Sequence, residues 1–445
     1  MKEPFTLYSS GIALARFAAE HADITHSGRD ILGLDFSEPR PMTAQNDTDY
    51  AAVKLQPYRL LTLRTEFEAA AASAPAEFSV DGLRYTRAER NGLLYYIQRG
   101  VKFPCDALFR DGRLIAWLCP CREQANLLVR DGFEEYTPLA LWKDYAARPL
   151  YGVSMLGTFH MPMRDGVELA ADVYLPEGAP LPVPALLVRT PYDKDDGAQT
   201  YFRYVRRGYA VVVQDVRGRN ESGGEWLPHY YEVEDGDDTL TWVGTQEWCD
   251  GSVGMLGGSY LGYTQWCAAA LGNPHLKAMI SVVTAGTAFA DGPLHGGCFS
   301  SGGFAWNFAM TKRRFAPERM DRADWDEILD IRPLEDIGQK ALGEDVPFIR
   351  KMLAHPCEDS FWLRGNWAKR STGKTVPVLI QSGWFDDNGM GTTEALDLTA
   401  GYPPGTRKVV LGPWQHSGNS RYDLHALSFP AGALRFDLDL LYQKW

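Results

Sequence analysis

A serine flanked by glycines follows a short apolar run in the middle of the chain. Val253–Leu256 lead into Gly257-Gly258-Ser259-Tyr260-Leu261-Gly262, and a helical pattern over Tyr263–Leu271 begins at once. Glycine fits a tight strand-to-helix turn because a side chain at these positions would clash with the neighbouring backbone. Such a turn lifts a serine hydroxyl above the end of a sheet, where it can act as a nucleophile. The segment therefore predicts a nucleophile elbow at Ser259.

Two further apolar runs end near residues that can complete a catalytic triad. The run Val376–Ile380 leads to Asp386, and the run Lys408–Leu411 leads to His416. Open α/β sheets build their sites beyond the carboxyl ends of their strands, so we expect the three side chains to meet at one sheet edge. The chain order serine, aspartate, histidine is that of α/β-hydrolases and differs from the orders in chymotrypsin and subtilisin.

Neighbouring residues offer alternatives at two of these positions. Asp387 follows Asp386 directly and competes with it for the acid's place. His425 competes with His416, but no strand precedes it in its polar stretch. We predict Ser259 as the nucleophile, His416 as the base and Asp386 as the residue that orients the imidazole. The backbone N–H of Tyr260 follows from the elbow geometry as one donor to the oxyanion.

Strands alternate with helical segments over much of residues 151–445, which predicts a mostly parallel sheet with helices on both faces. This part opens on a hairpin over Met161–Leu175 that turns at Asp165-Gly166. Further elements are expected as strands at Pro184–Val188, Gly208–Asp215 and Leu276–Val283 and as a helix at Glu232–Val243. The predicted fold class is α/β, with the α/β-hydrolase fold as its architecture.

The alternation stops over residues 291–370, where glycine-rich and aromatic stretches precede acidic helical segments. An insertion between the serine strand and the aspartate strand predicts a helical cap over the site. Its aromatic residues either line a substrate pocket or pack the cap onto the sheet. We expect Trp306 from this insertion and Phe385 beside Asp386 to contact the substrate.

Residues 1–150 have a different pattern, which predicts a small α+β accessory domain without chemistry of its own. A helix is expected over Leu60–Ala72, followed by short strands at Phe78–Val80, Leu93–Ile97 and Leu114–Leu118. Turn dipeptides separate the strands, as hairpins require. They are Asp81-Gly82, Asn91-Gly92, Asp111-Gly112 and Asp131-Gly132.

Composition narrows the classes of function. The formal net charge is −12, and only 18 basic and 20 acidic residues precede Tyr151, so most of the excess acid lies in the second part. This disfavours nucleic acid as a partner. No apolar run reaches membrane-spanning length, and seven cysteines, an odd number, favour a reducing compartment such as the cytoplasm. No histidine cluster with metal-ligand spacing occurs, so we predict neither a metal nor another cofactor.

Six segments between about Gly157 and Trp445 follow one another in a specific order. They are Arg189-Thr190-Pro191-Tyr192-Asp193-Lys194, Gln214-Asp215-Val216-Arg217-Gly218, Gly257-Gly258-Ser259-Tyr260-Leu261-Gly262, His355-Pro356 with Phe361-Trp362, Gly383-Trp384-Phe385-Asp386, and Gly412-Pro413-Trp414-Gln415-His416. With these segments in this order, the chain from about Gly157 to Trp445 resembles the cocaine esterase and Xaa-Pro dipeptidyl-peptidase family of serine hydrolases.

The resemblance implies an α/β-hydrolase fold with a helical cap and the triad Ser259, Asp386 and His416. It also implies that the hydroxyl of Tyr192 is the second oxyanion donor, and that esters or amides are cleaved through an acyl-enzyme. We expect Asp215 and Arg217 to form a structural ion pair beneath the elbow. Family members usually continue beyond the histidine into a β jelly-roll domain, which this chain lacks, so we expect a truncated form. Residues 1–150 match nothing in the family pattern.

Carboxylic ester hydrolysis is the leading hypothesis, with a small-molecule substrate. Peptide hydrolysis of the Xaa-Pro dipeptidyl type is the alternative, and it requires an anionic group for the free amine of the peptide. Acids near the cap, such as Asp291, are candidates. A non-catalytic binding or scaffold protein on a hydrolase fold is the hypothesis from another class. Self-association into a homo-oligomer stays open.

Overall fold

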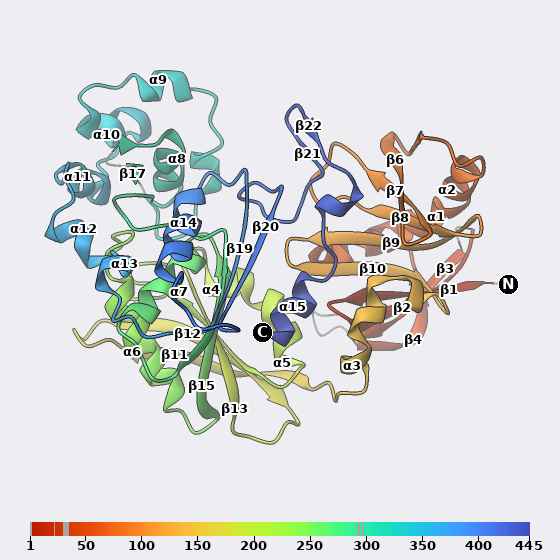
Figure 1. The fold of residues 1–445 in the computed structure, drawn as a ribbon, viewed down its shortest axis with the longest axis horizontal. Coiled ribbons are helices and arrows are strands. Elements are labelled where there is room, and N and C mark those ends of the chain that lie inside the picture. The colour runs from red at the N-terminus through yellow and green to blue at the C-terminus, as the bar shows by residue number, and fades with distance from the viewer. Residues whose placement is uncertain (1, 22, 30–34, 292–293, 296–297) are drawn as a thin grey trace. The chain divides into compact units, whose positions relative to one another are not determined.

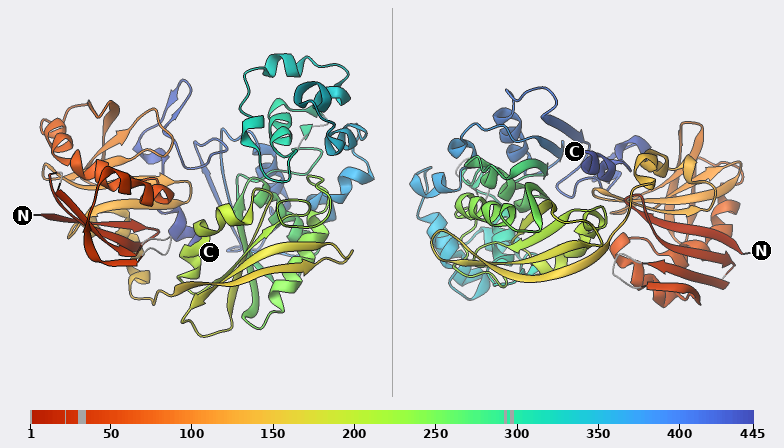
Figure 2. Two further views of the ribbon diagram at one scale, coloured as in Figure 1. Left: turned by 180° about the vertical axis from the view of Figure 1, so that it is seen from behind. Right: turned by 90° about the horizontal axis from the view of Figure 1, so that it is seen from below.

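The chain divides by its internal contacts into two units. The structure is a computed structural model that describes residues 2–21, 23–29, 35–291, 294–295 and 298–445. Unit 1 comprises Met1–Pro149, Gly383–Phe385 and Gly412–Trp445, and unit 2 comprises Leu150–Ser382 and Asp386–Leu411. Figure 1 and Figure 2 show the elements of both units from three directions.

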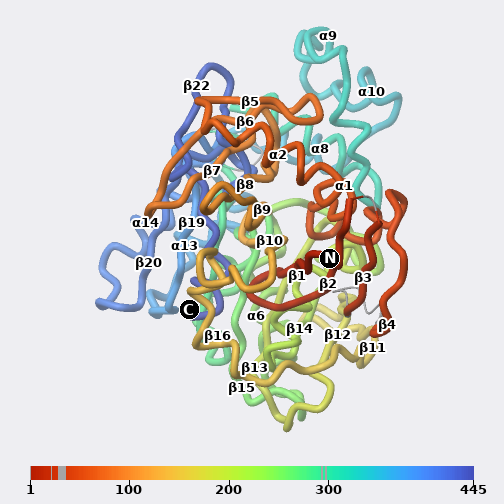
Figure 3. The backbone as a smooth tube through the Cα atoms, turned by 90° about the vertical axis from the view of Figure 1, so that its right-hand side faces the viewer, coloured from red at the N-terminus to blue at the C-terminus, as the bar shows by residue number. Residues whose placement is uncertain are grey.

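Unit 1 is built on a ten-stranded antiparallel sheet in the order β4-β3-β2-β1-β10-β9-β8-β7-β6-β5. The pairing of β1 with β10 places the first strand of the chain at the middle of the sheet. The strands are β1 (Glu3–Ser9), β2 (Ile12–Glu20), β3 (Asp23–Arg29), β4 (Asp35–Pro41), β5 (Glu77–Val80), β6 (Leu83–Arg90), β7 (Leu93–Gln98), β8 (Asp106–Arg110), β9 (Arg113–Cys121) and β10 (Gln124–Arg130). Their run can be followed along the tube in Figure 3.

Turns predicted from the sequence connect β5 to β6, β6 to β7 and β8 to β9. Asp81, Asn91 and Asp111 have φ near +50° and each is followed by a glycine with positive φ, as hairpin turns of the primed type require. The fourth dipeptide, Asp131-Gly132, instead ends β10 and leads into a short 3₁₀ helix at Glu134–Tyr136. The three strands expected at Phe78–Val80, Leu93–Ile97 and Leu114–Leu118 are confirmed as β5, β7 and part of β9, whereas β1–β4, β6, β8 and β10 were not predicted.

The two faces of the unit 1 sheet are covered differently. On one face the helices α1 (Pro57–Thr62) and α2 (Arg64–Ala71) pack on the sheet and bury large aromatics such as Phe67 and Trp117. The single helix predicted over Leu60–Ala72 is thus two helices that meet at Leu63. The other face has a smaller apolar cluster, and Phe436 from the end of the chain packs against it.

The last part of the chain is attached to the first 150 residues by many hydrogen bonds within unit 1. The Tyr422 hydroxyl donates to Asp106 at 2.5 Å, Phe103 N–H donates to Ser420 O at 2.7 Å, and Ala125 N–H donates to Asp439 at 3.0 Å. Its elements are β21 (Asp423–Leu424), β22 (Leu427–Ser428) and α15 (Leu438–Lys444). The sequence assigned these residues to the second domain, while the contacts group them with the first.

Unit 2 contains an eight-stranded sheet in the order β11-β12-β14-β13-β15-β16-β19-β20. β11 and β12 form the predicted hairpin, and parallel pairing joins β14, β13, β15, β16 and β19 in turn. β14 is buried at all six positions, as expected for a strand covered on both faces. The strands are β11 (Gly152–Pro162), β12 (Glu168–Glu177), β13 (Val183–Thr190), β14 (Ala210–Asp215), β15 (Cys249–Gly258), β16 (Leu276–Val282), β19 (Val378–Gly383) and β20 (Arg407–Gly412).

Helices of unit 2 contribute side chains to the apolar core of this sheet, among them α6 (Glu232–Gly244), α7 (Tyr260–Ala270) and α14 (Gly389–Leu398). The short helices α4 (Lys194–Gly197) and α5 (Phe202–Val205) contact β14. None of the helices that the structure describes combines the length and the apolar content that crossing a bilayer takes.

The insertion between β16 and β19 folds into short helices that gather into one group in Figure 1. They enclose a core of their own around Phe308, Ile337 and Met352. Its elements are β17 (Leu294–His295), β18 (Cys298–Phe299), α8 (Ser301–Ala309), α9 (Trp325–Leu329), α10 (Ile337–Leu342), α11 (Pro347–Leu353), α12 (Ser360–Arg364) and α13 (Trp367–Arg370). The glycine pair Gly296-Gly297 lies outside the described residues.

A buried acid in unit 1 makes stability depend on pH. Asp106 is 1% exposed, and burial raises the pKa of its carboxyl to about 7, although hydrogen bonds from Tyr422 and Gln98 oppose that rise. Between about pH 4 and pH 7 the folded protein therefore holds a proton that the unfolded chain has released. The unfolding free energy should fall as the pH rises through this window.

We expect Asp106→Asn to remove this contribution, because the amide stays neutral at every pH. From pH 5 to pH 8 the stability of the variant should improve relative to the wild type by about 2.7 kcal/mol, because about two pH units of the window lie in this range. Urea unfolding followed by tryptophan fluorescence at both pH values measures this. Asp111→Asn, at an exposed turn on the next strand connection, is the control. An unchanged pH dependence in Asp106→Asn would contradict the assignment.

Candidate active site

Ser259 lies at the junction of β15 and α7 in a strained backbone conformation. Its φ of 60° and ψ of −122° lie in a region where residues other than glycine are rarely found. The backbone holds it there, since Ser259 N–H donates to Val282 O at 3.0 Å and Ser259 O accepts from Tyr263 N–H at 3.0 Å. This strand–turn–helix geometry is that of the predicted elbow.

The glycines around Ser259 are required by close contacts. A Cβ on Gly257 would lie 2.5 Å from Leu261 Cβ, and one on Gly262 would lie 2.8 to 3.0 Å from Thr284. Leu261 thus occupies the room that Gly257 leaves open. This explains why a leucine follows Tyr260 where the general elbow motif has glycine.

Beneath the elbow, a buried network anchors Tyr260. The Tyr260 hydroxyl donates to Glu232 at 3.0 Å, and Glu232 forms an ion pair with Arg189 at 2.8 Å. Burial raises the pKa of Glu232, and the charge of Arg189 opposes this rise. This pair was not predicted from the sequence, although Arg189 follows an expected strand and Glu232 begins an expected helix.

Tyr192 follows β13 and contacts an aromatic residue of the insertion. Trp306 Nε1 donates to the Tyr192 hydroxyl oxygen at 3.1 Å. An indole N–H is a donor only, so Tyr192 accepts in this bond and directs its own hydrogen elsewhere. Trp306 also stacks on the Tyr260 ring, with centroids 5.7 Å apart. Trp306 therefore links the side chains of the two residues that the sequence assigned to the oxyanion hole.

Asp386 follows β19, and local bonds hold its carboxylate. Ser382 Oγ donates to one oxygen at 2.8 Å and Asn388 N–H to the other at 3.0 Å. Asp386 is partly buried, whereas Asp387 beside it is exposed. The structure thus gives Asp386 the more constrained position of the two acids.

The segments that precede Asp386 and His416 touch within unit 1. Phe385 N–H donates to Trp414 O at 3.0 Å, one residue before Asp386 and two before His416. A Cβ on Gly383 would lie only 2.0 Å from Trp414 O. The glycine of the Gly383-Trp384-Phe385-Asp386 motif is therefore required by this approach.

Two aromatic side chains of this segment are exposed. Phe385, predicted to contact substrate, is 45% exposed and lies 5.9 Å from Phe429 between ring centroids. Trp384 is 73% exposed, and the sequence analysis did not single it out. The motif in which it stands was the available signal.

Arg217 and Asp215, two charged residues of the predicted motifs, do not pair with each other. Arg217 pairs with Asp235 at 2.6 Å and with Asp165 at 2.7 Å. Asp215 instead accepts from Lys194 N–H and Asn220 Nδ2 at 2.9 Å. The predicted Asp215–Arg217 ion pair is wrong, because Asp215 ends β14 and holds the backbone of adjacent loops.

A buried histidine close to the elbow is a weak base. Burial lowers the pKa of His229 to about 3, so its ring does not readily take a proton. It packs against Tyr263 with ring centroids 4.5 Å apart, and its backbone N–H donates to the Tyr260 hydroxyl. His229 therefore has a structural role.

Known proteins match the second part of the chain. A profile of the X-Pro dipeptidyl-peptidase (S15 family) matches residues 165–418. Cocaine esterase of Rhodococcus sp. (strain MB1 Bresler) is 38% identical over 291 residues, which are 59% of this chain and 49% of that protein. A putative serine esterase of Mycobacterium bovis is 25% identical over 359 residues, 64% of this chain and 55% of that protein. The chain thus spans about half the length of these relatives.

Solved structures of other proteins match about two thirds of this chain. An α-amino acid ester hydrolase matches with a TM-score of 0.53 and 26% identity, over 64% of this chain and 52% of that chain. An aminopeptidase from a Thaumarchaeota archaeon matches with a TM-score of 0.51 and 26% identity, over 63% and 51% of the respective chains. With the mixed sheet of unit 2, these matches confirm the predicted α/β-hydrolase fold.

We expect Glu232→Gln to lower the unfolding free energy by about 3 kcal/mol, because it leaves the Arg189 charge buried without its counter-ion. Glu234→Gln on the same helix is the matched control, since Glu234 pairs with Arg370 in a more exposed place and should cost less than about 1 kcal/mol. Urea denaturation of the variants measures both. Equal losses in the two variants would contradict a special role for the buried pair.

Proposed function

The chain belongs to the X-Pro dipeptidyl-peptidase (S15) family, as the resemblance of its motifs indicated, and we propose that it is a serine hydrolase that cleaves carboxylic esters. The observation that carries this proposal is the strained elbow at Ser259, with φ of 60° between β15 and α7. A serine that only filled a turn would not need such a conformation. An intact Ser, Asp, His order also argues against a purely structural protein.

In the proposed mechanism, Ser259 attacks the carbonyl carbon of the ester while His416 takes its proton. Asp386 orients the imidazole and stabilises the imidazolium. His416 then returns the proton to the leaving alcohol, and an acyl-enzyme remains on Ser259. Water deprotonated by His416 attacks this acyl group and regenerates the serine. The bonds from Ser382 and Asn388 to Asp386 support its assignment over the exposed Asp387.

The oxyanion of the tetrahedral intermediate would be held by the Tyr260 backbone N–H and the Tyr192 hydroxyl. The first N–H groups of a helix have no acceptor within it, and Tyr260 opens α7. The indole of Trp306 donates to Tyr192, which leaves the Tyr192 hydroxyl to act as donor in its other bonds. Preorganised donors of this kind stabilise charge that develops in the transition state.

Ester substrates are favoured over Xaa-Pro peptides by the state of Asp291, the acid named for the amine of a peptide. Asp291 is fully buried, accepts from Gly391 N–H at 2.7 Å and Gly286 N–H at 3.2 Å, and pairs with His295 at 3.2 Å. An acid engaged in this way is a poor partner for a substrate ammonium group. Cocaine esterase and α-amino acid ester hydrolase are the similar proteins named for esters.

The proposal also includes the domain boundaries, the substrate contacts, the cellular location and the partners. We assign the catalytic domain to residues 151–445, the cap to 291–370 and the accessory domain to 1–150, with Trp306 and Phe385 in contact with a small-molecule substrate. A cytoplasmic location is supported by the seven cysteines, all without a disulfide. Nucleic acid is not proposed as a partner, because the net charge is −12.

We expect a fluorophosphonate probe to form one adduct on Ser259, because only an activated serine reacts with it at useful rate. Ser259→Ala should abolish labelling, and Ser252→Ala, at the start of the same strand, should leave it intact. Peptide mass spectrometry locates the adduct. A folded wild-type protein that stays unlabelled would rule out an activated Ser259.

The same variants decide between substrates when assayed on p-nitrophenyl butyrate and on alanyl-proline p-nitroanilide. Ester hydrolysis should exceed anilide hydrolysis in the wild type and vanish in Ser259→Ala. If p-nitroaniline were released from the anilide faster than p-nitrophenol from the ester, the peptidase alternative would replace the esterase proposal.

We expect Tyr192→Phe to lower kcat for the ester about 10²- to 10³-fold with little change in KM, because one oxyanion donor is lost. Tyr402→Phe is the control, since its hydroxyl only accepts a backbone N–H from Val376. Steady-state kinetics measure both variants. A loss confined to KM would show that Tyr192 contacts the substrate in its ground state instead.

A further inference from the structure

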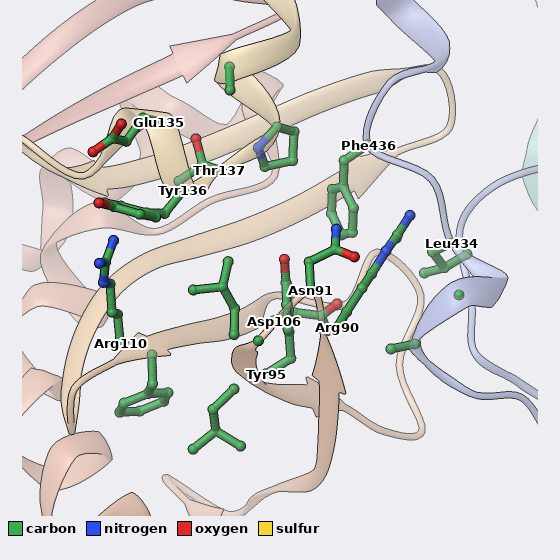
Figure 4. A pocket seen from close by; sticks show the side chains of 18 of the residues that line it. Arg90, Asn91, Tyr95, Asp106, Arg110, Glu135, Tyr136, Thr137, Leu434 and Phe436 are labelled. Carbon is green, nitrogen blue, oxygen red and sulfur yellow. The ribbon is translucent and has the colours of Figure 1, made fainter.

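Unit 1 contains a cavity of about 940 Å³ that no part of the proposed hydrolase reaction uses. All of its lining residues belong to unit 1. It is bounded by the β6–β7 and β8–β9 turns, by the 3₁₀ segments Glu134–Tyr136 and Pro138–Trp142, and by residues 431–437 near the chain end (Figure 4). Its volume is within the range of small-molecule sites.

The strand register places two arginines on the same face at the end of the sheet. Arg90 pairs with Leu93, and Tyr95 pairs with Leu108 two residues before Arg110. Directly paired residues share a face and alternate residues return to it. Arg90, Leu93 and Arg110 therefore lie in one row across three strands, so the two arginine backbones are about 10 Å apart. A ligand over Leu93 would meet a guanidinium on either side.

Apolar side chains line the same cavity. Leu93, Tyr95, Tyr136 and Phe436 pack against the apolar cluster on this face of the sheet. Phe436 reaches the cavity from the last part of the chain, opposite the strands (Figure 4). An occupant of the cavity would therefore contact an apolar wall and two cationic groups.

Acidic residues near the cavity do not use all the N–H donors of Arg90 and Arg110, so some of these donors remain available to a ligand. Arg110 stacks on Tyr136 with its guanidinium carbon 3.5 Å from the ring centroid, and its Nη1 is buried without a hydrogen-bond partner. Asp111 reaches only the Nε of Arg110, at 3.5 Å. Among the residues that the structure describes, Arg90 has no recorded ion pair. Buried donors without acceptors are rare in native proteins.

The acids of the cavity are otherwise engaged or exposed. Asp437 forms two hydrogen bonds with Arg435, at 2.7 and 2.8 Å. Asp106 accepts from the Tyr422 hydroxyl and is buried. Glu135 is exposed. Glu135 stays available to a ligand cation, whereas Arg90 and Arg110 together offer two positive charges to an anion.

We propose that this cavity binds a small organic carboxylate with an apolar body. The carboxylate would accept hydrogen bonds from the accessible part of the Arg110 guanidinium and from Arg90, because guanidinium groups match carboxylate geometry. The apolar body would lie over Leu93 and Tyr95 against Phe436. The proposal is independent of the triad, since none of the groups that it uses takes part in the hydrolase mechanism.

The test uses 11-(dansylamino)undecanoic acid as the probe and the full chain carrying Ser259→Ala, which prevents turnover. Dansyl fluorescence should rise saturably on binding. The primary amide of the same acid should bind at least about tenfold more weakly, because it lacks the charge. Arg110→Met and Arg90→Met should each weaken binding of the acid by a similar factor and leave binding of the amide unchanged.

Two further variants control the result. Arg84→Met removes an exposed arginine from the same strand as Arg90 but outside the cavity, and it should bind the acid as the parent does. Ala140→Trp fills the cavity from its rim and should abolish binding while thermal unfolding stays cooperative. No saturable binding, equal affinity for acid and amide, equal losses in Arg84→Met and Arg110→Met, or unchanged binding in Ala140→Trp would each overturn the proposal.

Discussion

The candidate active site depends on the backbone conformation of Ser259. A non-glycine residue with φ of 60° and ψ of −122° costs about 1–3 kcal/mol and persists only where its surroundings fix it. Here the neighbouring strand fixes it from one side through Val282 O, and the first turn of α7 fixes it from the other. Gly257 and Gly262 are consequences of this turn, because Leu261 and Thr284 occupy the space that their side chains would need. The serine, the glycines and the start of the helix are therefore one structural requirement.

A single connected set of contacts joins the proposed oxyanion donors to a buried charge pair. Arg189 pairs with Glu232, Glu232 accepts from Tyr260, the Tyr260 ring stacks on Trp306, and Trp306 donates to Tyr192. Each member of the set contacts the next and limits its movement. Both donors are thus positioned by side chains that need not touch the substrate. This gives Trp306 a structural role beside the substrate contact that the sequence suggested.

Local patterns in the sequence predicted the parts of the fold that local chemistry determines. The primed turns at Asp81-Gly82, Asn91-Gly92 and Asp111-Gly112 and the elbow at Ser259 require particular residues within a few positions. Strand β2, Ile12–Glu20, was missed because its alanines weaken the alternation, although Ser10-Gly11 before it has the positive φ values of a turn. The partners of Arg217 were missed for a different reason. Asp165 and Asp235 are distant in sequence, and only the tertiary fold selects them over Asp215.

Residues 1–150 have a structural role, because they order the segment that contains His416. That segment, Gly412–Trp445, has only two short strands, one turn of 3₁₀ helix and α15, too little to bury a core of its own. It is fixed instead by hydrogen bonds within unit 1, in which Tyr422 donates to Asp106, Ala125 N–H donates to Asp439 and Asn419 donates to the carbonyl of Arg122. A histidine that serves as a base must keep its position to within a fraction of an ångström. The folding of residues 1–150 is therefore a condition for the proposed chemistry, even though none of these residues takes part in it.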